Sequence, residues 1–337
     1  MTITYKNAGV NISEGEKFVN EIKKNVKATH SKSVLTDIGH FGGIYNASFP
    51  GMKEPCLVSS VDGVGTKLKI AFMMRQFNTV GQDLVNHCVN DIAVCGAKPL
   101  FFMDYFATGK LQKNIAVEVV KGFSKACIEN KCSIIGGETA EMPGFYQDGE
   151  FDIAGMIVGV VEKKNIIDGS KISSGDLLVA LPSTGLHTNG YSLARKILFP
   201  KYSKGKYFNK LNSTLGKSLM AVHRSYLNPI VELHKKKIIN GVAHITGGGI
   251  LGNTYRVVPK GYSLVVDWLR WKRPYIFDLI QQEGNVPESD MRRTFNLGVG
   301  LVFVINEKKV DLVFKCLKQI GEKPFIIGGV YKTKLFA

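Results

Sequence analysis

The chain has 337 residues, of which 45% are hydrophobic and 21% charged, a composition typical of a folded globular protein and not of a disordered one. Because this length exceeds one comfortable hydrophobic core, we expect two domains. No apolar run approaches the roughly 18 residues that cross a bilayer, which argues against a membrane-spanning helix. The six cysteines form no disulfide framework, and the first residues lack the apolar region of a secretory signal, so we expect a cytoplasmic protein.

The net charge of +16 is carried by the second half of the chain. Residues 1–165 contain 18 Lys and Arg against 17 Asp and Glu, whereas the remainder contains 26 against 11. The excess lysines are single or in short clusters, and they lack the interleaved aromatic residues of a base-stacking surface. We interpret them as solvated faces, with a basic rim that attracts phosphorylated substrates as the alternative.

Strand and helix patterns alternate along the chain, which favours an α/β or α+β fold. In the first half, we expect strands near 56–58, 100–107, 132–135 and 151–161, and helices over 79–96 and 114–131. The polar, turn-rich segment 162–175 predicts a boundary between domains at 1–165 and 170–337. In the second half, we expect a strand at 176–181, helices from 191 and over 219–235, and strands near Val242, Leu264, Val299 and Phe325.

The segment 59–67 combines groups that handle phosphate. Asp62 is expected where the strand that begins near Cys56 ends, and glycines, a hydroxyl and the Lys67 ammonium follow it within five residues. A carboxylate at the end of a strand indicates a functional site.

The expected helix 79–96 has one unusual face. At about 100° per residue, five polar side chains fall within an arc of roughly 140°, with no cation to pair them: Asp83, Asn86, His87, Asn90 and Asp91. Hard oxygen ligands of this kind suit Mg²⁺. The alternative, that these short polar groups bond to neighbouring backbone, is equally consistent with the helix face alone.

A third acidic group, Glu138, follows glycines after the expected strand 132–135. Asp62, Asp91 and Glu138 therefore each arise at or beside the end of a core element, and their convergence predicts a metal–nucleotide site in a cleft.

Two glycine-rich loops in the second half are candidate binding segments. The loop 183–190 places a hydroxyl, the His187 imidazole and an amide before a helix, where they can hold an anion or transfer a proton. The segment 246–254 has the glycine spacing of a P-loop but Asn253 where the lysine should be, which excludes a Walker A motif. Its backbone could still bind a phosphate. Arg293 either binds phosphate or pairs with an acid.

These segments, in this order, resemble the phosphoribosylformylglycinamidine cyclo-ligase (aminoimidazole ribonucleotide synthetase) family of purine biosynthesis. The likeness covers nearly the whole chain through YKNAGV at 5–10, VDGVGTK at 61–67, VND at 89–91, DYFATGK at 104–110, GGETAEMPG at 136–144, HTNGYS at 187–192, ITGGG at 245–249 and RTFN at 293–296. It implies ATP- and Mg²⁺-dependent ring closure of formylglycinamidine ribonucleotide, with ADP and phosphate released. It also implies an N-terminal mixed sheet that closes into a barrel across a homodimer, a C-terminal α/β sandwich, and nucleotide clefts lined by both domains.

The resemblance assigns roles by position. The implied ATP site comprises Gly39, Phe41, Gly42, Gly43, Asp62, Gly63, Gly65, Thr66, Lys67, Asn90, Asp91, Gly137 and Glu138. The implied metal ligands are Asp62, Asp91 and Glu138. The implied substrate side comprises Ser183, His187, Asn189, Gly190, Thr246, Gly247, Gly248 and Arg293. The implied catalytic residues are His187, which would orient or deprotonate the substrate amidine, with Asp62, Lys67 and Asp91.

Two other readings make different predictions. A thiamine-phosphate kinase-like phosphotransferase of the same superfamily would lack the string at 136–144. A basic nucleic-acid-binding protein would bind RNA or DNA with a steep salt dependence. We expect no nucleic-acid or membrane partner.

Overall fold

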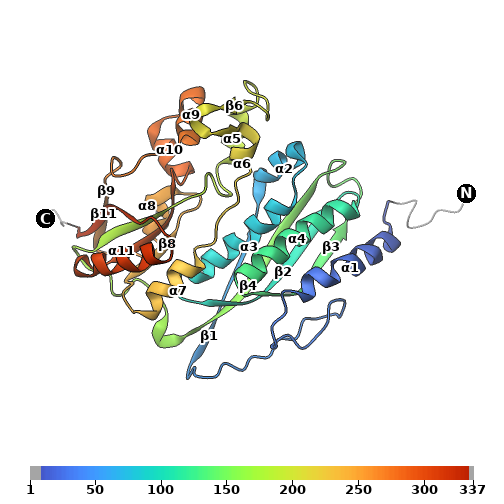
Figure 1. The fold of residues 1–337 in the computed structure, drawn as a ribbon, viewed down its shortest axis with the longest axis horizontal. Helices are drawn as coiled ribbons and strands as arrows, with labels where there is room; N and C mark the ends of the chain where they lie inside the picture. Colours follow the sequence, from blue (N-terminus) through green and yellow to red (C-terminus); the bar gives the residue numbers. More distant parts are fainter. Residues whose placement is uncertain (1–8, 334–337) are drawn as a thin grey trace, which may run out of the picture. The chain divides into compact units, whose positions relative to one another are not determined.

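The computed structural model describes residues 9–333, which form two compact α/β units (Figure 1). The first unit consists of residues up to 92 together with 98–163, and the second consists of 93–97 together with the chain from 164 onward. The motif at 5–10 lies largely outside the described residues. The expected two-domain α/β architecture is confirmed.

The first unit is built on a four-stranded mixed sheet in the order β1-β4-β2-β3. Its strands are β1 (Pro55–Gly63), β2 (Lys98–Thr108), β3 (Ser133–Glu141) and β4 (Phe151–Glu162). β4 pairs antiparallel with both neighbours, whereas β2 and β3 are parallel and are joined through helix α4 (Lys113–Glu129). A parallel pair needs such a crossover, because a tight hairpin reverses the chain direction.

Helices α3 (Asn78–Ala93) and α4 cover one face of this sheet (Figure 1). They approach backbone to backbone, since a Cβ on Gly81 would lie 2.3 Å from the Val119 carbonyl oxygen and one on Gly122 only 2.0 Å from that of Asn78. Helix α1 (Ile12–Lys27) packs beside α4 and buries Phe18 on its inner face. Its burial pattern follows the helical period, yet α1 was not predicted from the sequence.

The opposite face of the same sheet is not covered within the chain. Along β1, Leu57 and Val61 are each 66% exposed and Ser59 is exposed with them, while the alternate residues Val58 and Ser60 are less exposed and belong to the helix-covered face. Tyr105 of β2 lies on the same open face. A sheet with one apolar face open to solvent is a candidate for association.

The second unit has a five-stranded antiparallel sheet in the order β8-β10-β5-β11-β9. Its strands are β5 (Leu177–Pro182), β8 (Gly241–His244), β9 (Tyr262–Val266), β10 (Val299–Ile305) and β11 (Phe325–Lys332). Every residue of β10 is buried, because separate hydrophobic clusters pack on both faces of the sheet. Helices α7 (Leu227–Lys235) and α11 (Val310–Gln319) complete one cluster and α8 (Gly249–Thr254) the other. The expected C-terminal sandwich is confirmed.

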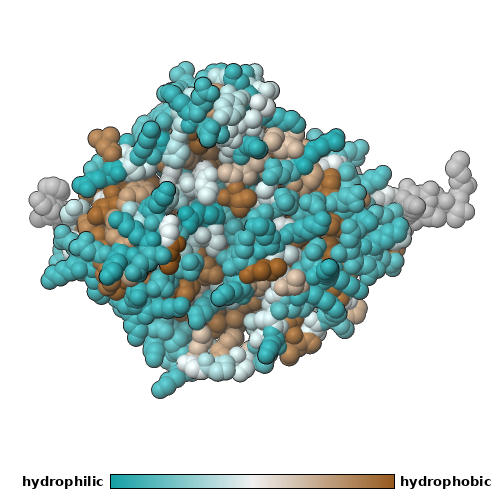
Figure 2. Space-filling view, viewed as in Figure 1, coloured by the Kyte–Doolittle hydropathy of each residue, from teal (hydrophilic) through white to brown (hydrophobic). Residues whose placement is uncertain are grey.

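Short elements complete the two units. They are α2 (Leu68–Met74), α5 (Tyr191–Leu198), β6 (Tyr207–Phe208), β7 (Ser213–Thr214), α6 (Leu215–Leu219), α9 (Tyr275–Gly284) and α10 (Glu288–Thr294). No helix among residues 9–333 combines the length and apolar character needed to cross a bilayer. On the face drawn in Figure 2, hydrophilic side chains are spread widely and apolar ones lie in small separate groups.

Two expected elements differ from the structure. The long helix expected over 219–235 begins only at Leu227, because Pro229 is tolerated in the first turn of a helix but not in its interior. The strand expected to end at Ile135 continues to Glu141, because it pairs with β2 along that length. Glu138 therefore lies within a strand and not in a turn after it.

Candidate active site

The expected position of Asp62 at the end of β1 is confirmed, and its carboxylate meets α3. Its Oδ2 lies 2.8 Å from His87 Nε2, and its Oδ1 accepts a hydrogen bond from the Gly63 N–H at 2.7 Å. Burial lowers the pKa of His87, but the hydrogen bond and charge of Asp62, aided by Asp91 and Asp83, outweigh it and raise that pKa. The pair is thus held toward the imidazolium–carboxylate form.

Asp91 lies one helical turn beyond His87 and belongs to the same edge of the unit. Its Oδ2 accepts a hydrogen bond from Ser60 Oγ of β1 at 3.2 Å. The carboxylates of Asp62 and Asp91 therefore occupy neighbouring positions where β1 meets α3, and both remain partly exposed. Two carboxylates that are partly open to solvent form a suitable donor set for Mg²⁺, which completes its shell with water and phosphate oxygens.

Lys67 is not placed where a phosphate contact requires it. Its Nζ lies 2.7 Å from Asp83 Oδ2, and both side chains are completely buried. Burial lowers the pKa of Lys67, and the charge of Asp83 opposes that shift only in part. The interpretation that the polar face of α3 has no cation to pair it was therefore wrong, because Lys67 reaches it from the turn after β1.

Glu138 does not join Asp62 and Asp91 within one chain. It is exposed on β3, opposite Tyr105 of β2, and so points to the open face of the sheet, whereas Asp62 points to the helix-covered face. β1 and β3 are the two edge strands, separated by β4 and β2, which at about 4.8 Å per strand places them about 14 Å apart. The predicted convergence of all three acids was wrong for a single chain, because strand order cannot be read from a local motif.

The loop 39–43 closes over a cavity of about 200 Å³ in the first unit. The cavity is lined by α1, by this loop, by Asp104 of β2, and by β3 at Gly136 and Gly137. Burial raises the pKa of Asp104 to about 7. The sequence contained a signal for this carboxyl group, since Asp104 is the one acidic residue in an aromatic-rich strand, but Asp104 was not predicted as a site residue.

In the second unit, His187 is held in the left-handed region at φ 62°. A non-glycine residue rarely adopts this conformation without a structural or functional reason. Its Nε2 accepts a hydrogen bond from the Thr184 N–H at 3.2 Å, and its ring stacks on His223 with centroids 4.0 Å apart.

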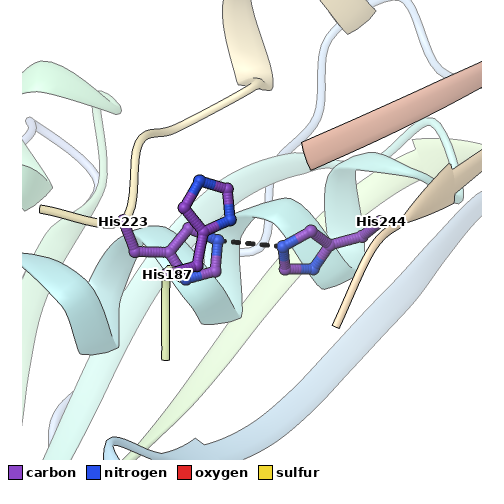
Figure 3. Close-up of side chains that lie close together, drawn as sticks. All are labelled: His187, His223 and His244. Atoms are coloured by element: carbon purple, nitrogen blue, oxygen red, sulfur yellow. Dashed lines mark hydrogen bonds between the residues drawn. The ribbon is translucent and has the colours of Figure 1, made fainter. Parts of the chain in front are cut away.

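Figure 3 shows His223 between His187 and His244, with the Nε2 atoms of His223 and His244 2.9 Å apart. All three imidazoles are buried, and their nitrogens lie within 4.8 Å of one another. The rings of His187 and His223 are only 12° from parallel, so a metal in the plane of both would require one ring to rotate. His223 and His244 were not predicted as site residues from the sequence, since neither belongs to a recognisable local motif.

Other residues predicted for the substrate side lie in the loop 183–190 and around the glycine-rich segment 246–254. Ser183 Oγ donates to Asn296 Oδ1 at 3.0 Å, and the Gly248 N–H donates to the Arg293 carbonyl at 2.9 Å. The Asn189 side chain lies against Gly247. The Arg293 side chain itself is exposed, whereas its neighbour Arg292 pairs with Glu288.

Asn253 explains why this loop is not a P-loop. Its side-chain amide donates to the carbonyls of Gly249 at 2.8 Å and Thr246 at 3.2 Å. The residue at the lysine position thus closes the loop on itself and leaves no ammonium for a terminal phosphate. Exclusion of the Walker A motif agrees with this geometry.

Comparison with known proteins identifies the class. The N-terminal domain model of AIR synthase related proteins matches residues 46–161, and the C-terminal domain model matches 173–337. The fold is shared with thiamine-monophosphate kinase from Stenotrophomonas maltophilia (TM-score 0.69, 13% identity, 93% and 94% of the two chains). It is also shared with hydrogenase maturation protein HypE in complex with ATP (TM-score 0.69, 15% identity, 97% and 88%). The chain therefore belongs to the AIR synthase family.

Within that family, a much nearer relative carries a specific name. The phosphoribosylformylglycinamidine cyclo-ligase of Alkaliphilus metalliredigens is 47% identical over 328 residues, which cover 97% of this chain and 94% of the relative. The resemblance stated from the motifs is confirmed.

Proposed function

We propose that the protein is an ATP-dependent cyclo-ligase that converts formylglycinamidine ribonucleotide to 5-aminoimidazole ribonucleotide in purine biosynthesis. The observation that carries this proposal is the 47% identity to a named cyclo-ligase along almost the entire chain. The thiamine-monophosphate kinase alternative shares the fold at only 13% identity, and this chain carries the string at 136–144 that such kinases would lack. We assign the enzyme to the cytoplasm.

The reaction requires one activation and one displacement. The formyl oxygen of the substrate attacks the γ-phosphorus of ATP and releases ADP. An amidine nitrogen then attacks the formyl carbon, loses a proton and expels the oxygen as phosphate. Phosphorylation converts a poor leaving oxygen into a good one, so the protein has to position two substrates, neutralise charge and move a proton.

The residues of the first unit fit the phosphate part of this reaction. Asp62 and Asp91 would hold Mg²⁺, which when bound neutralises phosphate charge. His87 fixes the orientation of the Asp62 carboxylate through their 2.8 Å contact. Lys67 acts as a positioning residue, because its buried pair with Asp83 anchors the turn after β1 to α3.

The second unit supplies the groups proposed for the ribonucleotide. His187, held by the Thr184 N–H and stacked on His223, would orient or deprotonate the amidine. The glycine loop beside Asn189 would lie against the substrate phosphate, and the exposed Arg293 would add positive charge there, while the N–H groups of Gly248 and Gly249 are already bonded within the unit.

The proposed enzyme is a homodimer that associates through the open face of the first-unit sheet. Leu57 and Val61 would be buried there, and two four-stranded sheets would close into a barrel. Closure would also bring an edge strand of one protomer to an edge strand of its partner. Glu138 could then serve a nucleotide site that its own chain cannot complete.

The deciding experiment is incubation of the purified protein with formylglycinamidine ribonucleotide, ATP and Mg²⁺, with the aminoimidazole product measured by diazo coupling. Product formation that depends on all three components is expected. A folded protein that yields no product would overturn the assignment. Nucleic-acid binding, the other class considered, predicts affinity that falls steeply with salt, and a weak, flat titration would dispose of it.

A further inference from the structure

Three histidines of the second unit form a cluster whose ring nitrogens converge. His187 comes from the loop before α5, His223 from the segment between α6 and α7, and His244 from the last position of β8. Each side chain is no more than 5% exposed, and one ring nitrogen of each lies within 4.8 Å of the other two. Three imidazoles gathered in this way are a donor set that proteins use to bind zinc.

His223 and His244 point nitrogen atoms at each other. Their Nε2 atoms are 2.9 Å apart (Figure 3), so one ring donates a proton to the other. The Nδ1 atom of His223 lies 3.4 Å from Thr188 Oγ1, on the other side of the ring. Two tetrahedral zinc ligands at about 2.0–2.1 Å from the ion lie about 3.3 Å from each other. A separation of the two Nε2 atoms by about 0.4 Å more would therefore admit the ion.

His187 can complete the set after a rotation of its ring. The ring is stacked on that of His223, 12° from parallel, so its lone pairs do not point at an ion in the plane of the His223 ring. Rotation about the side-chain bonds can bring a nitrogen to the ion, because that nitrogen starts within 4.8 Å of the other two. The rotation costs the hydrogen bond from the Thr184 N–H to Nε2 and the stacking contact. Binding would thus take His187 out of its present orientation.

The charge beside the cluster is balanced. Tyr226, whose ring centroid lies 6.1 Å from that of His187, donates its hydroxyl proton to the Pro182 carbonyl at 2.8 Å. The guanidinium of Arg224 lies over the Tyr226 ring, 4.8 Å from its centroid, and is paired with Glu322. The positive charge that would repel a bound cation is therefore compensated where it stands.

We propose that His187, His223 and His244 bind a zinc ion and that the bound ion inhibits the enzyme. The metal site depends only on the cluster, whereas the inhibition rests on the proposed role of His187 toward the substrate. Imidazole suits Zn²⁺, while Mg²⁺ prefers oxygen ligands such as Asp62 and Asp91. The ring that donates in the His223–His244 pair shifts its proton from Nε2 to Nδ1, so the ion binds neutral imidazoles without a net loss of protons.

The first test is calorimetry of Zn²⁺ binding to untagged protein, without nucleotide and with excess Mg²⁺ to occupy oxygen ligands. Wild-type protein should bind one Zn²⁺ per chain. His223→Phe keeps an aromatic ring in the stack but lacks ligand nitrogens, and His244→Gln removes the facing imidazole. Each should weaken binding by at least about 100-fold, because loss of an outer-shell partner alone costs about 10–100-fold. The matched control, His234→Gln on α7, removes an imidazole outside the cluster and should bind like the wild type.

Co²⁺ provides a second measurement that does not depend on any variant folding. In wild-type protein it should give the intense visible absorption of a tetrahedral site with nitrogen ligands and no thiolate charge-transfer band. A thiolate band, or equal Zn²⁺ affinity in the wild type, His223→Phe and His244→Gln, would overturn the metal site and leave the cyclo-ligase assignment standing.

The inhibition is tested by turnover at buffered concentrations of free Zn²⁺. Product formation by the wild type should fall as the site fills and recover on chelation, whereas His223→Phe, compared with its own zinc-free rate, should lose this sensitivity. Full turnover with the site occupied would overturn the inhibition. A wild-type protein that binds Zn²⁺ through His223 but makes no product under zinc-free conditions would overturn the cyclo-ligase assignment and leave the metal site standing.

Discussion

Removal of Asp83 tests whether the Lys67 pair anchors the turn after β1. At 2.7 Å and an effective dielectric constant of about 20, the attraction between the two charges is about 6 kcal/mol, and desolvation offsets part of it. Breaking a buried pair by removing one partner costs about 3–5 kcal/mol, because the remaining charge stays buried. Asp83→Ala should therefore lower the free energy of unfolding of the first unit by about that amount, with a fall in Tm of about 10 °C.

The measurement is urea unfolding followed by a probe in the first unit, with Lys67→Met/Asp83→Leu as the matched control. Replacing both partners by apolar side chains leaves no uncompensated charge, so the double variant should be more stable than Asp83→Ala. The reasoning is refuted if Asp83→Ala costs less than about 1 kcal/mol, or if the double variant is less stable than both Asp83→Ala and Lys67→Met.

Three further outcomes are expected. Asp62→Asn should lower the pKa of His87 in an NMR titration, and an unchanged titration would contradict the pairing. Because the pKa of His87 is raised in the folded wild type, the stability that the pair contributes is fully present below about pH 6.5 and is lost as pH rises through the folded pKa. Asp91→Ala should reduce kcat by about 100-fold or more and alter the Mg²⁺ dependence, whereas Asp148→Ala on an exposed turn should change neither; wild-type turnover and Mg²⁺ response in Asp91→Ala would remove the metal assignment. Val61→Lys should shift the protein from dimer to monomer in light scattering without unfolding it, and a wild-type monomer would refute the dimer.

Local patterns were sufficient for much of the first unit. Asp62 could be placed at a strand end because a short apolar run precedes it and glycines follow it at 63 and 65, and the α3 face followed from the helical period alone. The pairing of Lys67 with Asp83 could not be predicted from those patterns, because it depends on how the turn after β1 folds back onto the helix.

Features that depend on strand order and on packing between distant segments could not be predicted from the sequence. Glu138 was expected beside Asp62, but the two lie on opposite edge strands, an arrangement decided by β4 inserting between β1 and β2. The elevated pKa of Asp104 comes from burial under elements that are remote in sequence, and His223 reaches His187 only through the fold of the second unit.

The backbone contact between α3 and α4 limits how the phosphate end of the site can respond to ligands. Because Gly81 and Gly122 leave no side chain between the two helices, α3 cannot slide or tilt by itself without a clash against α4. His87 and Asp91 are therefore carried on a rigid pair of helices and should keep their positions through the catalytic cycle. In the nucleotide site proposed above, conformational adaptation would then fall to the loop 39–43, so the opening rate of this loop, and not motion of the carboxylates, is expected to govern nucleotide exchange.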